Sequence, residues 1–514
     1  MPHPVILRSA AAIVLGATLA IPSMARAQAD DPIVAPPVAA SPTATPIAPA
    51  PAPAPLAKID PKADPVPAAK APEAGRFEFG SYGRVRFGSD LRGGTGRQSN
   101  IVAHGSRFNE ESYAELELRR EDTFKDDIKT KVVATLAVFP PFFHFSGTAS
   151  QQFAMRNLYA QATYNNYTLW AGSRMYRGDD IYLLDWWPLD NQNTLGGGFG
   201  GKLPKSLGET TVAAHVGMQR LDNPYQFQQI AVQPRFGFGT ATVTQLDRPR
   251  IVETLKVTHL LRNNADHHVF DDDPDNKKGF KIIGYGELHQ LSSGVARDTV
   301  TNLEKPLPGD TGFLIGTELA YWTGERDTFV QLFLRHARGV AAYDPLSSPQ
   351  SFANDKTTRG STETLVALGG NWESGMFGVL GGAYLRFFRD GDPSPTSTQK
   401  YDEGTLVVRP QAYFGEHWGL ALDASYQQRR LAVLDPTTDA PLSASLLRFG
   451  FMPYFSPAGR GSYKRPQFRL LYSVTARDAG ARSLYPLEDV FARRKVEHFA
   501  GLGVEWWFNS SSYP

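Results

Sequence analysis

From residue 76 to residue 508 the chain repeats one pattern, in which apolar and polar side chains alternate over short runs. In the first run Phe77 and Phe87 fall on one face, and Arg84 and Arg86 fall on the other. Because successive side chains of a β-strand point to opposite faces, the alternation predicts strands that are apolar on one side only. The same pattern returns in 112–119, 129–139 and 468–477.

The repeating region is long enough for many such strands. At roughly 20 to 25 residues for a strand with its connection, it predicts about 16 to 18 strands. Long polar stretches, typical of the outer loops of a membrane barrel, cover 263–278, 343–360 and 389–403. A soluble β-sandwich would show the same alternation but bury its apolar face. The number of strands favours an all-β, transmembrane, antiparallel β-barrel with a water-filled lumen lined by the charged face.

Both ends of the chain support this interpretation. Residues 1–29 combine Arg8, an apolar stretch and the small-x-small sequence Ala27-Gln28-Ala29, which is typical of a cleaved secretory signal peptide. The barrel region 76–508 closes on two tryptophans and a phenylalanine, and a short tail, 509–514, follows. We therefore predict export to the bacterial outer membrane, with a multi-pass barrel in contact with lipid.

Between the signal peptide and the barrel, residues 30–75 are rich in alanine and proline. Such a segment cannot bury a core and samples extended conformations. We interpret it as a periplasmic linker, although the composition also fits a segment that reaches a partner or the cell wall.

Composition excludes some chemistry. The chain has no cysteine, which rules out disulfides and thiol-based metal binding. Its net charge of +1 gives no support for a nucleic-acid partner. The acidic stretch 271–276 lacks the glycine and the glutamate of a calcium loop, and the adjacent His267 and His268 have no ligand spacing. We predict no metal and no cofactor.

A barrel of this width needs something to narrow it, and the candidate is the segment 174–188 after a predicted strand at 168–173. Its charged and aromatic residues are too irregular for a strand. Folded inward, the segment would form a constriction loop that places carboxylates, a guanidinium and indole rings in the lumen. A surface loop above a packed aromatic pair explains the same residues equally well.

Several segments together resemble the maltoporin family of carbohydrate-specific outer-membrane porins. They are Phe79-Gly80-Ser81-Tyr82-Gly83-Arg84, 106–116, 156–161, Leu169-Trp170-Ala171-Gly172 with Tyr176, Asp180 and Asp185 behind it, Arg465-Pro466-Gln467-Phe468-Arg469 and Val504-Glu505-Trp506-Trp507. The likeness is best in the first third and at the end of the chain. It implies a barrel of about 18 strands, usually a trimer, with the third loop folded into the pore.

The resemblance also implies which side chains line the path of a sugar chain. A slide of aromatic rings corresponds to Tyr82, Tyr113, Phe329, Tyr463 and Trp507, with a weaker counterpart of the outermost ring within 142–145. The polar track and constriction beside it correspond to Arg84, Arg107, Glu115, Arg156, Asp180, Asp185 and Trp187.

The alternation of side chains between the two faces of a strand tests the aromatic slide independently of the resemblance. Tyr82 shares its strand face with Arg84, and Trp507 shares its face with Glu505. The other three rings also fall on charged faces by the same count, whereas an outward ring would belong to the lipid interface. All five are therefore predicted to face water. Two departures from the family pattern, Gly178 and Trp187 in the constriction loop, leave channel size and sugar preference open.

These observations predict a non-enzymatic porin that lets maltose and maltodextrin-type oligosaccharides diffuse passively along the slide. A less selective general diffusion porin would use the same barrel. An outer-membrane enzyme acting on lipid or glycan is the third alternative, with Glu115 and Asp185 as a conceivable acid–base pair. We favour charge complementarity to nearby arginines as their role, because no nucleophile, base and orienting group occur together in the sequence.

Overall fold

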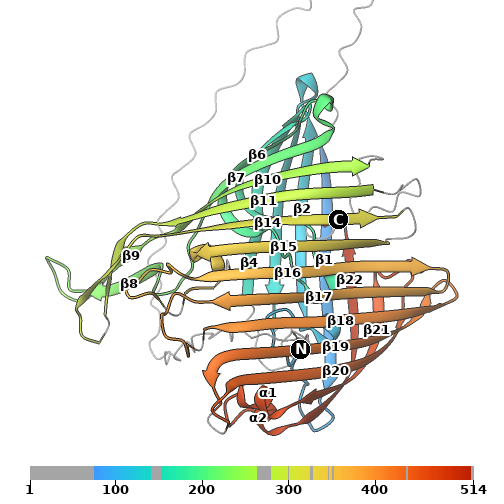
Figure 1. Ribbon diagram of the computed structural model, residues 1–514. Coiled ribbons are helices and arrows are strands. Elements are labelled where there is room, and N and C mark those ends of the chain that lie inside the picture. Colours follow the sequence, from blue (N-terminus) through green and yellow to red (C-terminus); the bar gives the residue numbers. More distant parts are fainter. Residues whose placement is uncertain are drawn as a thin grey trace, which may run out of the picture. The chain divides into compact units, whose positions relative to one another are not determined.

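The computed structural model describes residues 75–140, 152–262, 279–298, 300–323, 328–344, 347–349, 352–397, 399–435 and 438–510. Its main feature is a single antiparallel sheet of 18 strands. The sheet is closed, because β1 (Arg76–Ser89) pairs with β2 (Tyr113–Thr123) on one side and with β22 (Val496–Phe508) on the other. Figure 1 shows the long strands running side by side around the barrel. The predicted all-β, antiparallel barrel is confirmed.

The remaining barrel strands, in chain order, are β3 (Lys129–Phe139), β4 (Gln152–Tyr164), β5 (Tyr167–Arg177), β6 (Asn191–Lys202), β7 (Glu209–Gln219), β10 (Arg250–Arg262), β11 (Gly279–Leu291), β14 (Asp310–Trp322), β15 (Phe329–Gly339), β16 (Thr362–Ser374), β17 (Phe377–Arg389), β18 (Tyr401–Phe414), β19 (Trp418–Leu434), β20 (Pro441–Phe455) and β21 (Gln467–Arg477). Two hairpins stand outside the barrel sheet: β8 (Phe227–Val232) with β9 (Ala241–Asp247), and β12 (Gly294–Arg297) with β13 (Glu304–Leu307). Two short helices, α1 (Ala479–Ser483) and α2 (Val490–Arg493), lie between β21 and β22.

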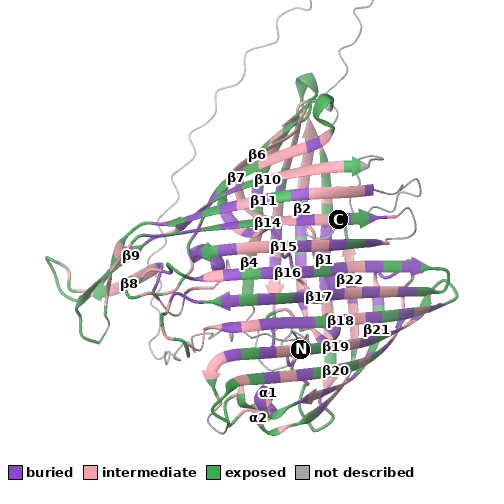
Figure 2. Ribbon diagram, in the orientation of Figure 1, coloured by how far each residue is buried: buried purple, intermediate pink, exposed green. Residues whose placement is uncertain are grey.

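The strands have the two faces that alternation predicts. On β1, Phe77 and Phe87 are 73% and 76% exposed, whereas Tyr82 between them is 1% exposed. The alternation of buried and exposed residues recurs along the barrel strands, as Figure 2 shows. Outward apolar side chains form the surface that lipid covers, and the inward face carries most of the charged residues.

The two rims of the barrel differ in their connections. At the rim where β1 begins and β22 ends, tight turns such as Asn165-Asn166 and Gly375-Met376 join the strands. Asn165 and Gly375 have φ values of 51° and 55°, the left-handed conformation that these residue types tolerate in hairpin turns. Longer connections gather at the opposite rim, including 90–112, 220–249 and 340–361. Short turns are periplasmic in outer-membrane barrels, so the termini of the barrel lie on that side.

This topology corrects one expectation about the loops. The polar stretches 343–360 and 389–403 join strands at the long-loop rim, as predicted. The stretch 263–278 lies outside the described residues, but its flanking strands, β10 and β11, end and begin at the periplasmic rim. The prediction of a long outer loop between these two strands is therefore wrong, because both strands have these ends at the periplasmic rim. The acidic residues 271–276 and the neighbouring histidines lie outside the described residues.

A second correction concerns the lumen. Alternation with charged residues predicted an inner face that is wet throughout. Along β14 to β17 the inner face is instead apolar in part, and Leu314, Phe333, Leu365 and Leu380 belong to one buried cluster. The cluster is completed by side chains from a loop inside the barrel, described below. The open path is consequently displaced toward the wall formed by the first strands and β22.

Candidate functional site

The loop that follows β5, residues 178–190, folds into the lumen as the constriction loop. Ile181, Leu183 and Leu189 are at most 2% exposed, although they lie in a connection between strands. The constriction loop contains a short 3-10 helix, Tyr182–Leu184. The predicted segment began at 174, but Arg174 to Arg177 continue β5. An inward loop is therefore confirmed, and the alternative of a surface loop is wrong.

Glycines on the barrel wall formed by β14, β16 and β17 provide room for the apolar residues of the constriction loop. A Cβ atom at Gly382 of β17 would lie 2.9 Å from Cγ2 of Ile181, and one at Gly369 of β16 would lie 3.1 Å from its Cγ1. A Cβ at Gly316 of β14 would lie 2.5 Å from a methyl group of Leu189. Any larger residue at these positions would push the loop off the wall. The small residues thus fix how far the loop reaches across the lumen.

Ion pairs hold both ends of the constriction loop. Asp179 pairs with Lys281 of β11, and Asp190 accepts a bond of 2.7 Å from Lys256 of β10. Arg335 of β15 donates to the backbone oxygen of Pro188 at 2.6 Å. The loop is therefore tied to the wall at its beginning, at its end and along its apolar middle.

A second loop, residues 90–112 between β1 and β2, also folds inward and was not predicted. Its Ile101 and Val102 are 1% and 3% exposed and join the apolar cluster. Arg448 of β20 donates to the backbone oxygen of Ser99 at 2.6 Å. The signal in the sequence was an apolar pair inside an otherwise polar connection, which buries only if the loop turns toward the barrel axis.

Aromatic rings form a file down the inner wall. On the outer side, Phe139 and Tyr113 have centroids 5.3 Å apart, and Tyr113 and Tyr82 have centroids 5.9 Å apart. Toward the periplasmic rim, Tyr182 of the constriction loop lies 6.0 Å from Trp507 and 5.5 Å from Tyr463. Tyr463 is in turn 6.1 Å from Phe329. Trp507 packs against the outer rings Tyr82 and Tyr113 and also against the cluster that contains Tyr182, Tyr463 and Phe329. The file of rings is therefore continuous.

All five predicted rings belong to this file, and the sequence analysis missed two members. Phe139 is the last residue of β3, and Tyr182 comes from the constriction loop. The parity argument was wrong for Tyr463, because this residue lies in the connection before β21 rather than on a strand. The part of the chain around 142–145, which held a weaker ring candidate, lies outside the described residues.

Charged side chains line the file at the constriction. Glu505 of β22 is 1% exposed and receives bonds from Arg465 at 2.9 Å and from Arg469. Arg107 of the inward loop 90–112 donates to Glu505 at 3.3 Å and to Tyr82 Oη at 2.5 Å. One carboxylate therefore binds three guanidinium groups, one from strand β21 and two from connections between strands. Glu505, Arg465 and Arg469 were quoted in the family resemblance but were not predicted as site residues.

A second cluster of charged side chains lies on the outer side of the constriction loop. Tyr113 donates to Glu115, and Arg156 Nε lies 3.3 Å from the same carboxylate. Arg84 donates to Tyr82 Oη at 2.6 Å and lies 3.7 Å from Asp185. Ring hydroxyls and charged groups thus alternate around one path, as expected where aromatic and polar contacts to a solute are interleaved.

Between the outer rim and the constriction is a cavity of about 310 Å³, the main compartment. It contains seven of the twelve predicted site residues, and these are Tyr82, Tyr113, Arg84, Glu115, Arg156, Asp185 and Trp187. Arg107 borders it through its bond to Tyr82. Phe329, Tyr463 and Trp507 lie further along the ring file.

Asp180 is the predicted residue whose environment differs most from expectation. It is 6% exposed, does not line the main compartment, and its Oδ2 has no hydrogen-bond partner among the described residues. Burial raises the pKa of Asp180 to about 7, with a smaller opposing effect of Arg107. The residue is therefore a titratable group beneath the constriction rather than a contact of the polar track.

The described part of the chain holds no group of three or more His, Asp or Glu side chains placed to bind a metal ion. Within the same residues, no helix is long and apolar enough to cross a membrane.

A closed barrel with an apolar outer face, an inward loop and a path lined by rings and charges defines an outer-membrane porin. The family model of the LamB porin matches residues 77–508, which is most of the chain. The protein therefore belongs to the LamB porin family, and the resemblance drawn from the sequence is confirmed.

Solved structures of outer-membrane proteins are distantly similar. The channel DcaP of Acinetobacter baumannii is 12% identical over 86% of this chain and 99% of its own, with a TM-score of 0.41. OccAB4 of the same organism is 9% identical over 85% and 99%, with a TM-score of 0.39. OmpT of Vibrio cholerae, in its trimer form, is 12% identical over 85% and 100%, with a TM-score of 0.35. All three are too distant to bear on the solute of this channel. No curated protein matches the chain.

Proposed function

We propose that this porin is selective for carbohydrates and admits maltose and maltodextrin-type oligosaccharides by passive diffusion. The observation that carries the proposal is the unbroken file of rings from Phe139 through Tyr82 and Trp507 to Phe329. It passes along the main compartment and through the constriction, so a chain-like solute would contact rings over the whole narrow part of the pore.

The chemistry of a glucan matches such a path. Its pyranose units have apolar C–H patches, which flat rings cover with little loss of side-chain entropy. Hydroxyl groups surround these patches and need both donors and acceptors to replace water. Arg84 and Arg156 supply donors, and Glu115 and Asp185 supply acceptors. Many weak contacts in a row let a solute move on without being trapped.

The charge balance of the main compartment favours a neutral solute. Three arginines and three carboxylates line it: Arg84, Arg156, Arg177, Glu111, Glu115 and Asp185. Glu115 pairs with Arg156, and Asp185 lies 3.7 Å from Arg84. Carboxylates whose oxygens already engage arginine side chains are poor candidates for the acid and base of a glycosidase. We infer that the channel performs no chemistry on its solute.

Export and assembly are part of the proposal. Residues 1–29 act as a signal peptide, 30–75 as a periplasmic linker, and the barrels assemble as homotrimers. Size-exclusion chromatography with multi-angle light scattering on the purified mature protein tests the assembly. A mass of one barrel would contradict it.

Liposome swelling tests selectivity. Maltose and sucrose are disaccharides of equal mass, so a difference in rate reports recognition rather than size. We expect faster swelling with maltose. Equal rates for the two sugars would support the alternative of a general diffusion porin, and no swelling with either would remove the transport function altogether.

A further inference from the structure

Outward aromatic side chains show that the wall formed by β15 to β19 faces lipid. Figure 1 shows these strands side by side. At the periplasmic ends of four of them, large aromatic side chains are between 48% and 62% exposed, and these are Trp372, Phe377, Phe414 and Trp418. Outward aromatic residues at one end of the strands form the girdle of a lipid interface. Lipid therefore covers this wall from the girdle outward.

The length of β17 places its last residue at the outer edge of the hydrocarbon. β17 has 13 residues and runs from Phe377, in the girdle, to Arg389. A strand of this length that is tilted by about 40° rises roughly 30 Å along the barrel axis. The hydrocarbon core of a bilayer is also about 30 Å thick. Arg389 therefore lies at the height of the lipid headgroups of the outer leaflet.

Arg389 belongs to a row of three arginines on the lipid-facing side of the wall. In the register of the sheet, Thr362 of β16 lies opposite both Arg338 of β15 and Arg389. Arg430 of β19 lies opposite Asp402 of β18, which in turn pairs with Arg389. The arginine row, which we define as Arg338, Arg389 and Arg430, thus crosses the wall near the outer ends of its strands. Each member lies two strands from the next, which corresponds to about 10 to 12 Å.

Two members of the arginine row lack a counter-charge from the described part of the chain. Arg338 and Arg430 are exposed, and neither has a hydrogen-bond or ion-pair partner among the described residues. Toward the middle of the membrane, the outward side chains of the same wall are apolar, as at Leu334 and Leu385. A guanidinium at the edge of hydrocarbon is costly unless it meets an anion or the headgroup layer. The lipid headgroups are the nearest source of that anion.

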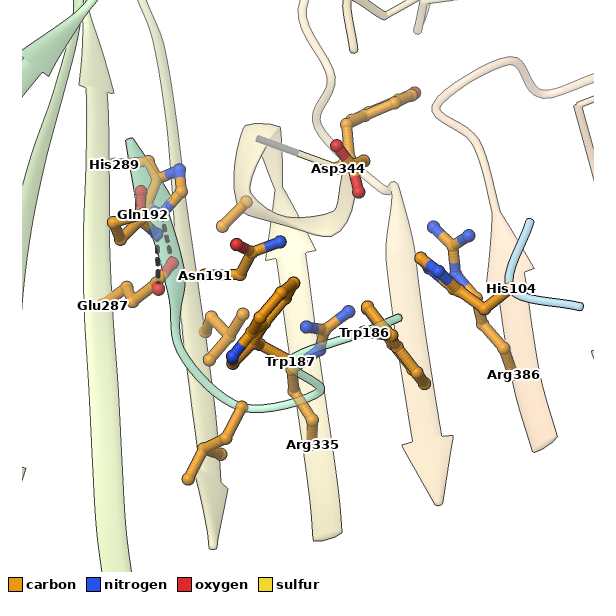
Figure 3. A pocket seen from close by; sticks show the side chains of 14 residues that line it. His104, Trp186, Trp187, Asn191, Gln192, Glu287, His289, Arg335, Asp344 and Arg386 are labelled. Carbon is orange, nitrogen blue, oxygen red and sulfur yellow. Dashed lines mark hydrogen bonds and ion pairs between the residues drawn. The ribbon is translucent and has the colours of Figure 1, made fainter. Parts of the chain in front are cut away.

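Arginines on the inner face of the same strands are paired within the protein. Figure 3 shows Arg335 of β15 and Arg386 of β17 beside a pocket inside the barrel. Both form ion pairs with Glu363 of β16. Arg338 and Arg389 come three residues later in the same strands, so they lie on the opposite face. The inner arginines thus share a carboxylate of the protein, whereas Arg338 has none among the described residues.

We propose that the arginine row is a binding site for the phosphorylated glycolipid of the outer leaflet, lipid A. Its disaccharide carries a phosphate at each end, so the two phosphates are separated by about the spacing of neighbouring arginines in the row. Phosphate oxygens accept the paired donors of a guanidinium group. The acyl chains of the same lipid cover the apolar side chains below the row. The site lies outside the lumen, so the inference is independent of the solute that the channel admits.

Native mass spectrometry of the purified protein in a non-ionic detergent counts bound lipid directly. The protein is titrated with lipid A that carries two phosphates, and with the same lipid after removal of both. We expect the phosphorylated form to bind more tightly, and Arg338→Gln and Arg430→Gln each to weaken its binding about fivefold. Arg338→Lys keeps the charge and should retain most of the affinity. Equal binding of phosphorylated lipid A by the wild type and by the double glutamine variant overturns the proposal.

Arg120 supplies the matched control, because it lies on the outer face of β2 near the periplasmic rim with its side chain 39% exposed. Arg120→Gln should bind lipid A as the wild type does, and an equal loss there would refute a specific site. Displacement of the lipid by inorganic phosphate would contradict a lipid site in favour of one for free phosphate. The same spectra report the oligomer. A smaller assembly in the glutamine variants, with lipid binding unchanged, would overturn the proposal and make the row a contact between subunits.

Discussion

Tyr182, on the constriction loop, donates a hydrogen bond of 2.7 Å to Glu505 on the last strand of the barrel. This bond links the ring file to the cluster of arginines, because Glu505 also forms ion pairs with Arg465 and Arg107. The carboxylate is nearly inaccessible to bulk water and is surrounded by three guanidinium groups. Its negative charge therefore offsets part of the positive charge of the three guanidinium groups around it.

Replacing Glu505 with glutamine should make the pore more selective for anions. The amide keeps the shape of the side chain but leaves three guanidinium groups without their shared negative partner. Reversal potentials in a KCl gradient measure the change. Glu416→Gln is the matched control, because Glu416 pairs with Arg460 at the periplasmic rim and its side chain is 70% exposed. Equal reversal potentials in the two variants would refute this assignment.

Removing a ring from the file should weaken sugar binding without closing the pore. Tyr113→Ala and Trp507→Ala each lose one aromatic face, worth about 0.5–1.5 kcal/mol, which is roughly a 2- to 10-fold loss of affinity. Ion conductance should stay the same or rise. Current block by maltohexaose measures both quantities at once.

Lipid-facing rings supply the controls for that experiment. Trp418 is 62% exposed on the outer face of β19, and Tyr321 is 41% exposed on β14. Their alanine variants should bind sugar as the wild type does. Unchanged binding in both Tyr113→Ala and Trp507→Ala would leave the file without a role in recognition.

Two neighbouring glycines of β17 test how the constriction loop is seated. Gly382→Leu would collide with Ile181, at a cost of about 1–3 kcal/mol, and should displace the loop and raise ion conductance. Gly381→Leu is the control, since a Cβ there meets nothing within 4 Å. Thermal unfolding and single-channel conductance should change only at position 382. The same conductance in both variants would mean that the glycine does not set the reach of the loop.

The buried Asp180 predicts a pH dependence near neutrality. Its pKa is raised from 3.8 to about 7, so the stability contributed by the protonated form is complete below the unfolded value and is lost as pH rises through about 7. Over the same interval the constriction gains a negative charge. Cation selectivity should therefore increase between about pH 6 and pH 8.

The corresponding variant is Asp180→Asn, which keeps the size of the side chain and cannot ionise. Its reversal potential should not vary over that interval. If the variant and the wild type show the same pH dependence, another group is responsible for it.

Much of this architecture could be predicted from local sequence. Strand faces follow from alternation because lipid and water impose opposite demands on successive residues, as Phe77 and Tyr82 show. The file was largely predictable for the same reason, since Tyr113 and Trp507 share faces with charged residues. Residues outside strands have no such parity. Tyr182 and Tyr463 reach the file from connections, so their positions depend on how those segments fold back.

The apolar packing inside the barrel could not be anticipated from alternation. It depends on pairing between segments far apart in sequence, such as Ile181 against Gly382 or Ile101 against the wall strands. Glycines on an inner face look unremarkable in a strand until the side chain that fills the space is known. Asp180 illustrates the same limit, because a charged residue predicted for the polar track is buried by the loop that carries it.

The most direct test of the central claim is single-channel ion current through the purified protein in a planar bilayer during titration with maltohexaose, with sucrose as comparison. The proposed function predicts saturable block by maltohexaose and little effect of sucrose, because only the longer chain would contact several rings of the file together. Steady current at all concentrations of both sugars would contradict carbohydrate selectivity and leave a general diffusion pore.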